Sequence, residues 1–417
     1  GRAMDPITLR AEATAEAELS PSEPGQSLAR FYGYQLVAEI GLTGGIWILY
    51  LQHLGLSLTQ IGIAEAVFHL APITLELPSG SLADVFGRKW TLALSSLCVA
   101  LAAFLMLMAT TLANPLLLVF PAMYLSGASF ACRSGSAQAF LYDSLAERGG
   151  AGTFSKLLGR ILSASYLLLA VTTWVGAVLA DVNFGWPYAL TVAVGLGGVW
   201  LAVGLREPVR ERVAHRSMRR TMAEALTIVR GRPRLAMLLV FTSALWTMLT
   251  LVNLYAQAVL SELGLSTSTV GLVIGATLLF TAAGMWFAHR ITARGTFRIW
   301  AVTTALLIVG AGLGLGSGVL LLAIAIYLAA ELFAGIFEPL LSARINDSLA
   351  APQRATILSI EGLMFSITMV WAFPLVGLVA DRAGWLAAFG GAGVVVIVLL
   401  ALWLIFASQG EPPLEAR

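Results

Sequence analysis

Ionisable side chains stand inside stretches that are otherwise apolar, where such side chains can carry protons. Glu65, His69 and Glu76 follow one another at helical spacing, so a helix would bring all three to one face. Ionisable residues also interrupt other apolar stretches: Glu39, Arg133 and Glu361 stand alone, and Glu331 and Glu338 share one stretch. A carboxyl group that alternates between an apolar environment and a neighbouring guanidinium takes up a proton in the first and releases it in the second. These residues therefore indicate proton transfer or ion pairing inside a hydrophobic layer.

The elements that position these residues are expected to be membrane-spanning helices. Of the 417 residues, 58% are apolar and 12% are charged, whereas soluble domains average about 45–50% apolar and about 25% charged. Crossing the hydrocarbon layer takes roughly 20 apolar residues, and a helix pairs all of their backbone groups. Twelve such runs are predicted, at 31–52, 58–80, 90–112, 115–144, 156–180, 186–206, 234–260, 267–288, 298–316, 319–343, 355–380 and 385–407.

Basic residues lie mainly in alternate connections, beginning with Arg88 and Lys89 and most densely between residues 206 and 234. Because Lys and Arg are retained on the cytoplasmic side, both termini are expected there, in a multi-pass protein of the plasma (inner) membrane. The net charge of only +2 gives no argument for a nucleic-acid partner. Cys98 and Cys132 fall in apolar runs and are expected to be packing residues rather than a disulfide.

Three short sequences occur twice, in the same order and at nearly constant offset. Residues 54–62 return at 263–271, Asp143–Ala146 returns at 347–350, and the Ala-Asp and Gly-Trp pairs at 180–186 return at 380–385. The repeat predicts an all-α membrane protein of twelve transmembrane helices in two six-helix halves. The expected division is a disordered cytoplasmic tail at 1–29, one half at 30–206, a basic cytoplasmic linker at 207–233, the other half at 234–407 and a cytoplasmic tail at 408–417.

Residues 80–89, Gly-Ser-Leu-Ala-Asp-Val-Phe-Gly-Arg-Lys, lie between the second and third runs. They resemble the signature loop of the major facilitator superfamily, G-x-L-A-D-x-x-G-R-K, at every defined position. The resemblance implies that fold, transport by alternating access, and a cytoplasmic gate formed by Gly80, Asp84, Gly87, Arg88, Lys89 and the acid Asp143 at the end of the fourth run. The alternative is that Arg88 and Lys89 only fix the orientation of the chain in the membrane.

Residues 142–145 and 354–359 resemble, more loosely, the bacterial drug:proton antiporters of this superfamily with twelve spans. The glycine-rich pattern of those antiporters is missing from the fifth run, which offers only Gly176 near its end. The resemblance makes Glu39, with Arg133 as partner, the first candidate for proton coupling. Glu65, His69, Glu331 and Glu361 are further candidates for coupling or for the substrate cavity. A static ion pair that orders the helices is the alternative for Glu39 and Arg133.

The function expected from these features is efflux of a lipophilic or cationic small molecule, because acids outnumber bases inside the runs. The expected partners are the substrate, protons and the lipid bilayer, with the proton gradient as energy source, no cofactor, no metal, and a monomer as working unit. The alternatives are a proton symporter or uniporter that imports a small metabolite and, more remotely, a membrane-embedded transferase. The 207–233 connection holds no Ser/His/Asp or His/Cys cluster, so an enzyme is not expected.

Overall fold

The computed structural model describes residues 23–147, 154–208, 227, 229–288, 290, 297–347 and 351–408. Within these ranges the chain forms twelve helices and no strand, which confirms the all-α fold class. The first half contains α2 (Glu23–Ala38), α3 (Trp47–His53), α4 (Leu58–Phe86), α5 (Arg88–Ala109), α6 (Leu116–Ala146), α7 (Phe154–Val182) and α8 (Gly185–Val203). The second contains α10 (Pro233–Glu262), α11 (Thr267–Ala288), α12 (Phe297–Ser317), α13 (Leu320–Asp347) and α14 (Ala351–Ser408).

Ten of these helices are long and apolar enough to cross a membrane. The second to tenth predicted spans coincide with α4–α8 and α10–α13 to within several residues. The eleventh and twelfth are the two legs of α14, which changes direction at Gly384, where φ is 79° and favours glycine. The predicted tails and most of the predicted linker lie outside the described residues, although α2 already begins at Glu23. Cys98 and Cys132 are buried free thiols.

The first span differs from its prediction as one helix over 31–52, because residues 39–46 between α2 and α3 are not helical. Backbone groups of this break bond to other helices, as unpaired polar groups are costly in an apolar layer. The Gly41 N–H donates to the Thr172 hydroxyl of α7 at 3.0 Å. The Gln257 amide of α10 donates to the Gly44 carbonyl at 2.9 Å, and its oxygen accepts the Ile48 N–H at 3.1 Å.

Helix α7 lies unusually close to this break. A Cβ atom placed on Gly176 would stand 1.7 Å from the carbonyl oxygen of Leu42. Any side chain at that position would therefore have to displace either α7 or the break. Gly176 therefore has a packing role in this chain, although the glycine-rich pattern of the antiporters is missing around it.

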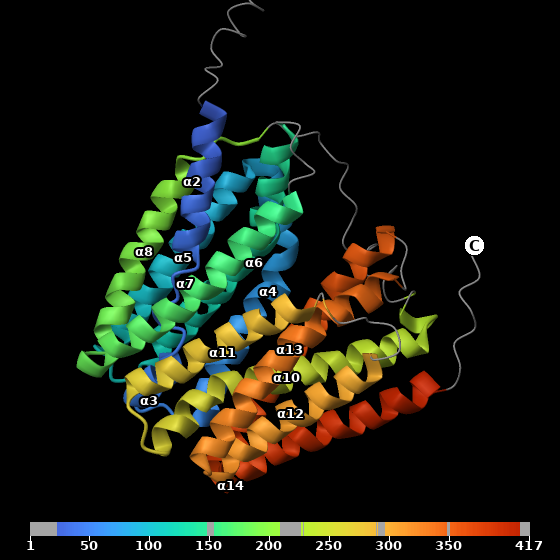
Figure 1. The fold of residues 1–417 in the computed structure, drawn as a ribbon. Coiled ribbons are helices and arrows are strands. Elements are labelled where there is room, and N and C mark those ends of the chain that lie inside the picture. The colour runs from blue at the N-terminus through green and yellow to red at the C-terminus, as the bar shows by residue number, and fades with distance from the viewer. Residues whose placement is uncertain are drawn as a thin grey trace, which may run out of the picture.

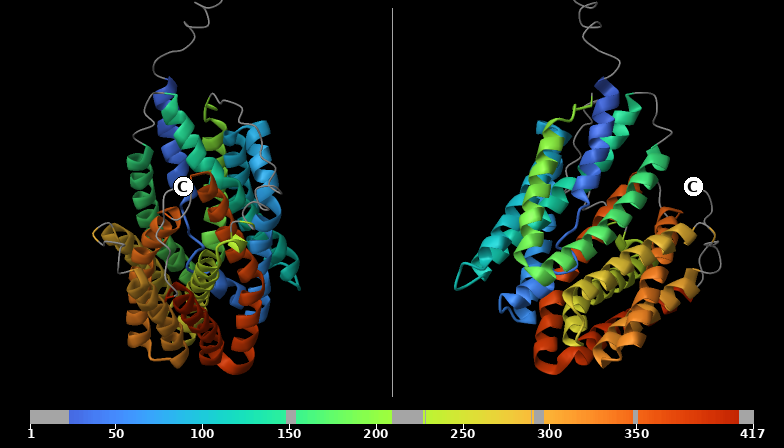
Figure 2. Two further views of the ribbon diagram at one scale, coloured as in Figure 1. Left: turned by 90° about the vertical axis from the view of Figure 1, so that its right-hand side faces the viewer. Right: turned by 60° about the vertical axis from the view of Figure 1, so that its left-hand side comes forward.

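The two halves meet at one end of the molecule and diverge from it, as Figures 1 and 2 show. At this end α4 packs along α14, α7 packs along α11, and α3 contacts α10. We call it the closed end; it carries the connections 54–57, 183–184 and 263–266 and the turn at Gly384. The opposite end, where α2 and α5 begin, is called the open end.

Two aspartates bond across the halves at the closed end. The carboxylate of Asp381, in α14, accepts the N–H groups of Leu58 and Thr59 at 3.1 and 2.8 Å, and the Thr59 hydroxyl at 2.6 Å. The carboxylate of Asp181, in α7, accepts the Ser268 N–H at 3.1 Å. Each aspartate therefore caps the first turn of a helix that belongs to the other half.

Candidate functional site

Glu39 and Arg133 form the ion pair that the sequence predicted between them. Glu39 is the first residue of the break after α2, and Arg133 lies in the interior of α6. One guanidinium nitrogen of Arg133 bonds Oε1 of Glu39, and the two side chains are 27% and 22% exposed, respectively. Because the pair is only partly buried and lies next to non-helical backbone, the carboxylate can separate from the guanidinium without a helix having to unfold.

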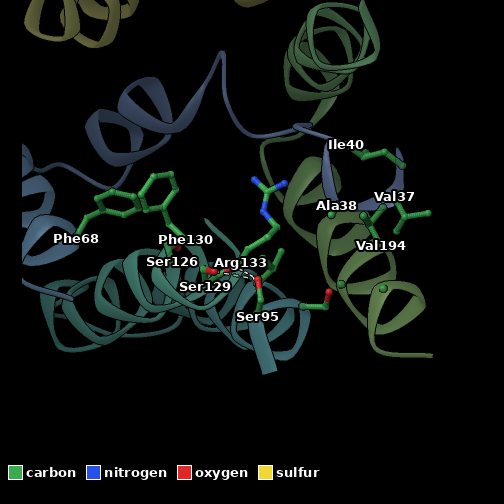
Figure 3. A pocket seen from close by; sticks show the side chains of 14 residues that line it. Val37, Ala38, Ile40, Phe68, Ser95, Ser126, Ser129, Phe130, Arg133 and Val194 are labelled. Carbon is green, nitrogen blue, oxygen red and sulfur yellow. Dashed lines mark hydrogen bonds between the residues drawn. The ribbon is translucent and has the colours of Figure 1, made fainter. Parts of the chain in front are cut away.

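A pocket of about 200 Å³ lies beside Arg133 within the first half. Figure 3 shows Arg133 and the rings of Phe68 and Phe130 among the side chains that line it. Its polar lining consists of the hydroxyls of Ser95, Ser96, Ser126 and Ser129. The Ser95 hydroxyl donates to the Ser129 carbonyl oxygen at 2.9 Å. The pocket therefore combines hydroxyl groups, aromatic rings and one guanidinium.

Tyr166 is a candidate site residue that the sequence did not reveal. It lies on α7, is partly buried, and is within electrostatic range of Glu39 in the first half and of Glu331 and Glu338 in the second. A single tyrosine in an apolar helix has the pattern of an ordinary packing residue, so no signal marked it. Tyr166 is therefore a position on α7 at which acids of both halves act electrostatically on one hydroxyl.

Glu331 has neutral neighbours instead of an arginine. It lies on α13 with 4% of its surface exposed, and the Thr281 hydroxyl of α11 donates to its Oε2 at 2.5 Å. Among the described residues, its Oε1 has no hydrogen-bond partner. One turn earlier, the Tyr327 hydroxyl donates to the Asn253 side-chain oxygen at 2.6 Å. Buried carboxyl groups of this kind are candidates for binding a proton or a cation.

Glu65 and His69 form a separate pair where α4 meets α14. The His69 Nε2 and Glu65 Oε1 atoms are 3.4 Å apart, and both residues are buried. The ring of Phe365 from α14 stands edge-on to His69, with 5.5 Å between ring centroids. Glu361 lies in the same leg of α14, partly buried, and interacts electrostatically with Glu338. The six candidates for coupling or the cavity thus fall into four places rather than one cluster.

The signature loop shows the ion pair of Arg88 with Asp143, which joins the start of α5 to the end of α6. Gly87 adopts a φ of 101°, which explains why glycine is required there. The side chain of Lys89 lies over the Trp90 ring at 5.2 Å from its centroid. The backbones of Gly80 and Asp84 lie in α4, and the surroundings of both residues lie outside the described part of the structure.

Glu207 is a second residue of this region that the sequence did not single out, because it fell in the predicted linker. Its carboxylate accepts the N–H of Arg88 at 2.6 Å and the N–H of Lys89 at 2.9 Å. A Cβ atom on Gly87 would lie 2.9 Å from the carboxyl carbon of Glu207. Glu207 therefore caps α5 from the segment that follows α8 and holds the signature loop at the open end.

Glu207→Ala is expected to lower the free energy of unfolding by about 1 kcal/mol, the usual cost of losing a helix cap. Glu207→Gln keeps one acceptor oxygen for these N–H groups and is expected to lose less. The check is the melting temperature of the purified protein in detergent. Equal melting temperatures for the wild type and Glu207→Ala would contradict the capping role.

The chain is similar to several known proteins over most of its length. An uncharacterized MFS-type transporter of Bacillus subtilis (strain 168), YxaM, is 24% identical over 255 residues, or 58% of this chain. That match spans 61% of the length of the relative. Among solved structures, a mutant of the nucleoside transporter NupG has a TM-score of 0.76 at 14% identity, covering 90% of this chain and 98% of that one. A D-xylose–proton symporter has a TM-score of 0.65 at 16% identity, covering 93% and 97%.

A family model agrees with the fold and with the signature loop. The model described as Major Facilitator Superfamily matches residues 36–330 and 255–417, which together take in both halves. The structural neighbours, at such low identity, show the shared fold alone. The chain belongs to the Major Facilitator Superfamily.

Proposed function

We propose that this transporter is a proton-coupled exporter of lipophilic or cationic small molecules that works by alternating access. The observation that carries the proposal is the Glu39–Arg133 ion pair, held partly buried at a break in the first span. Membership of the superfamily supports transport as such. What we propose beyond transport is that protons are the coupling ion, that the substrate is lipophilic or cationic, and that it moves out of the cell.

Proton coupling follows from the two environments that Glu39 can occupy. A guanidinium beside a carboxylate stabilises the negative charge of that carboxylate, and Arg133 stands in this position beside Glu39. When the pair separates, the isolated carboxylate in an apolar layer is favoured as the neutral acid and takes a proton from water. When Arg133 returns, the proton leaves again. A cycle that separates and restores the pair on opposite sides of the membrane moves one proton per turn.

The charge balance favours a cationic substrate. The acids Glu39, Glu331, Glu338 and Glu361 lie on the break, α13 and α14, while Arg133 is the basic residue near Glu39. A cation can therefore compete with Arg133 for a carboxylate, which would link substrate binding to the state of the pair. The rings of Phe68 and Phe130 beside Arg133 add apolar and cation–π contact area for a lipophilic ligand.

Export is proposed from the resemblance of residues 142–145 and 354–359 to the bacterial drug:proton antiporters. The distribution of basic residues supports a cytoplasmic position for both termini. With that orientation the open end faces the cytoplasm and the closed end faces outward. We propose that the protein works in this way as a monomer in the plasma membrane. The proton gradient supplies the energy, so neither a cofactor nor an enzymatic step is needed.

Proton-coupled or passive import of a small metabolite is the second candidate. The observation that favours it is the row of serine hydroxyls in the pocket beside Arg133. Hydroxyl groups suit a polar, hydroxyl-rich compound better than a lipophilic cation. The two candidates therefore differ in the compound that the same cavity would accept.

The test is transport by the purified protein in liposomes with an acidic lumen. The exporter is expected to accumulate ethidium in the lumen as protons leave, and a protonophore is expected to stop the accumulation. Parallel assays use labelled xylose and labelled uridine, with protein-free liposomes as the control. Ethidium flux that ignores the pH gradient would remove proton coupling. Uptake of xylose or uridine without ethidium uptake would favour the importer.

A further inference from the structure

We propose that Asp181 and Asp381 are positioning residues for alternating access: together they latch the closed end, and both must release before that end can open. The proposal rests on transport by the superfamily fold. It depends neither on the identity of the substrate nor on proton coupling. It can therefore fail or succeed separately from the proposed exporter function.

The geometry of the Asp381 contact supplies the first argument. Leu58 and Thr59 are the first two residues of α4, whose N–H groups have no partner within their own helix. Both donate to the Asp381 carboxylate, and the Thr59 hydroxyl gives a third hydrogen bond. A carboxylate at this position also interacts favourably with the positive end of the helix dipole. Within its own half, α4 is capped by Ser57, whose hydroxyl accepts the Gln60 N–H at 3.3 Å. Asp381 adds partners for the N–H groups of Leu58 and Thr59, which this cap does not reach.

The internal repeat supplies the second argument. Asp181 occupies in the first half the place that Asp381 occupies in the second, and the capped segments 54–62 and 263–271 are the other repeated pair. Asp181 accepts the N–H of Ser268 near the start of α11. In the same way, Asp381 accepts the N–H of Leu58 at the start of α4. The two caps therefore run in opposite directions between the halves, one on α4 and one on α11.

These contacts run between the two halves at the closed end, and this position determines their effect on opening. Contacts inside one half persist when the halves rock as rigid bodies, but a bond from one half to the other at the closed end has to break when that end opens. Both aspartates are exposed, so water can replace the lost N–H partners and the latch can release reversibly. The fully buried Gln257 joins the break of the first span to α10 at the same end and reinforces the closure.

The number of hydrogen bonds predicts an order of effects. Asp381 receives three and Asp181 receives one. Asp381→Ala is expected to raise the ratio of open to closed molecules at this end by about threefold to thirtyfold, as loss of a helix cap does. Asp181→Ala is expected to raise the ratio less than Asp381→Ala does, and the double variant more.

The measurement is the distance between two spin labels, one in each half, by pulsed electron paramagnetic resonance on the full chain in nanodiscs. The labels are attached to cysteines that replace Thr111, in the connection after α5, and Ser317, the last residue of α12, after Cys98 and Cys132 have been changed to alanine. Both positions are exposed at the closed-end side of their halves. The distance distribution reports opening directly and needs no substrate. A merely structural role of the aspartates would lower the melting temperature without adding a longer distance.

Glu262 provides a matched control. It is an exposed acid at the same end, but it accepts the Trp385 indole N–H at 2.8 Å within its own half. Glu262→Ala is therefore expected to leave the distance distribution unchanged. The latch is refuted if Asp381→Ala and Asp181→Ala also leave it unchanged, or if Glu262→Ala shifts it as far as they do.

Two further variants decide the matter if the alanine variants do not fold. Thr59→Val removes the hydroxyl bond to Asp381 from the opposite side, and Asp381→Asn keeps an acceptor oxygen but loses the charge. Both are expected to shift the distribution in the same direction as Asp381→Ala, by a smaller factor. Because Thr59 and Asp381 share one contact, their effects should be less than additive when combined. Additive effects would show that the two residues act independently and would count against the latch.

Discussion

Transport driven by a pH gradient is expected to fall to the rate of protein-free liposomes in Glu39→Gln, while exchange of labelled for unlabelled substrate continues. A glutamine still offers an oxygen to Arg133, so the break and α6 keep their contact. The amide cannot bind and release a proton, so net movement against a gradient loses its energy source. Exchange involves no net proton movement and survives. Comparing gradient-driven uptake with exchange in the same liposomes provides the check.

Glu65→Gln is the control for this substitution. It makes the same chemical change in the same half of the protein, on a carboxylate that contacts His69 instead of an arginine. Gradient-driven uptake is expected to persist in this variant. If Glu65→Gln loses uptake and Glu39→Gln keeps it, coupling belongs to the α4 pair and the role assigned to Glu39 is wrong. Glu331→Gln then tests the acid that remains in the second half.

Gly176→Ala is expected to lower the free energy of unfolding more than a Gly→Ala substitution elsewhere in α7. The added Cβ would overlap the Leu42 carbonyl oxygen at 1.7 Å, and backbone atoms cannot rotate away as a flexible side chain can. Overpacking of this kind costs about 1–3 kcal/mol or more. The melting temperature of the purified variant is expected to fall, together with its yield as a monodisperse protein.

Gly159→Ala is the matched control, because it lies in the same helix and a Cβ there would meet nothing within 4 Å. Alanine favours a helix over glycine by about 1 kcal/mol, so this variant is expected to be as stable as the wild type or more stable. A Gly176→Ala protein that melts at the same temperature as Gly159→Ala would show that α7 can move away from the break at little cost.

The helices and the two halves could be predicted from the sequence, because the hydrocarbon layer imposes length, apolarity and helical pairing on every span. The break after Ala38 could not, since an apolar run reads as one helix whether or not it is interrupted. Gly41, Gly44 and Gly45 were the available signal. Glycines are common in membrane helices, however, and the partners that pair this backbone come from α7 and α10.

The candidate site divides in the same way. Glu39 and Arg133 could be found because charged residues in apolar runs are rare and tend to pair. Tyr166 and Glu207 are ordinary residue types at their places, and only the tertiary fold gives them acidic or backbone neighbours. Asp181 and Asp381 could be found from the sequence only in part. Their repetition was visible in the sequence, whereas the crosswise pairing depends on how the halves meet.

The break between α2 and α3 is a linker whose two attachment points, here called anchors, lie in different halves of the protein. At one anchor Gly41 is bound to Thr172 in the first half, and at the other Gly44 is bound to Gln257 in the second. When the halves turn relative to each other, the distance between these anchors changes. The linker then has to extend or contract, or one of the two hydrogen bonds has to break. Glu39, the first residue of the break, lies two residues before the Gly41 anchor. Rotation of the halves therefore acts on residues 41–44, directly after the carboxylate that pairs with Arg133.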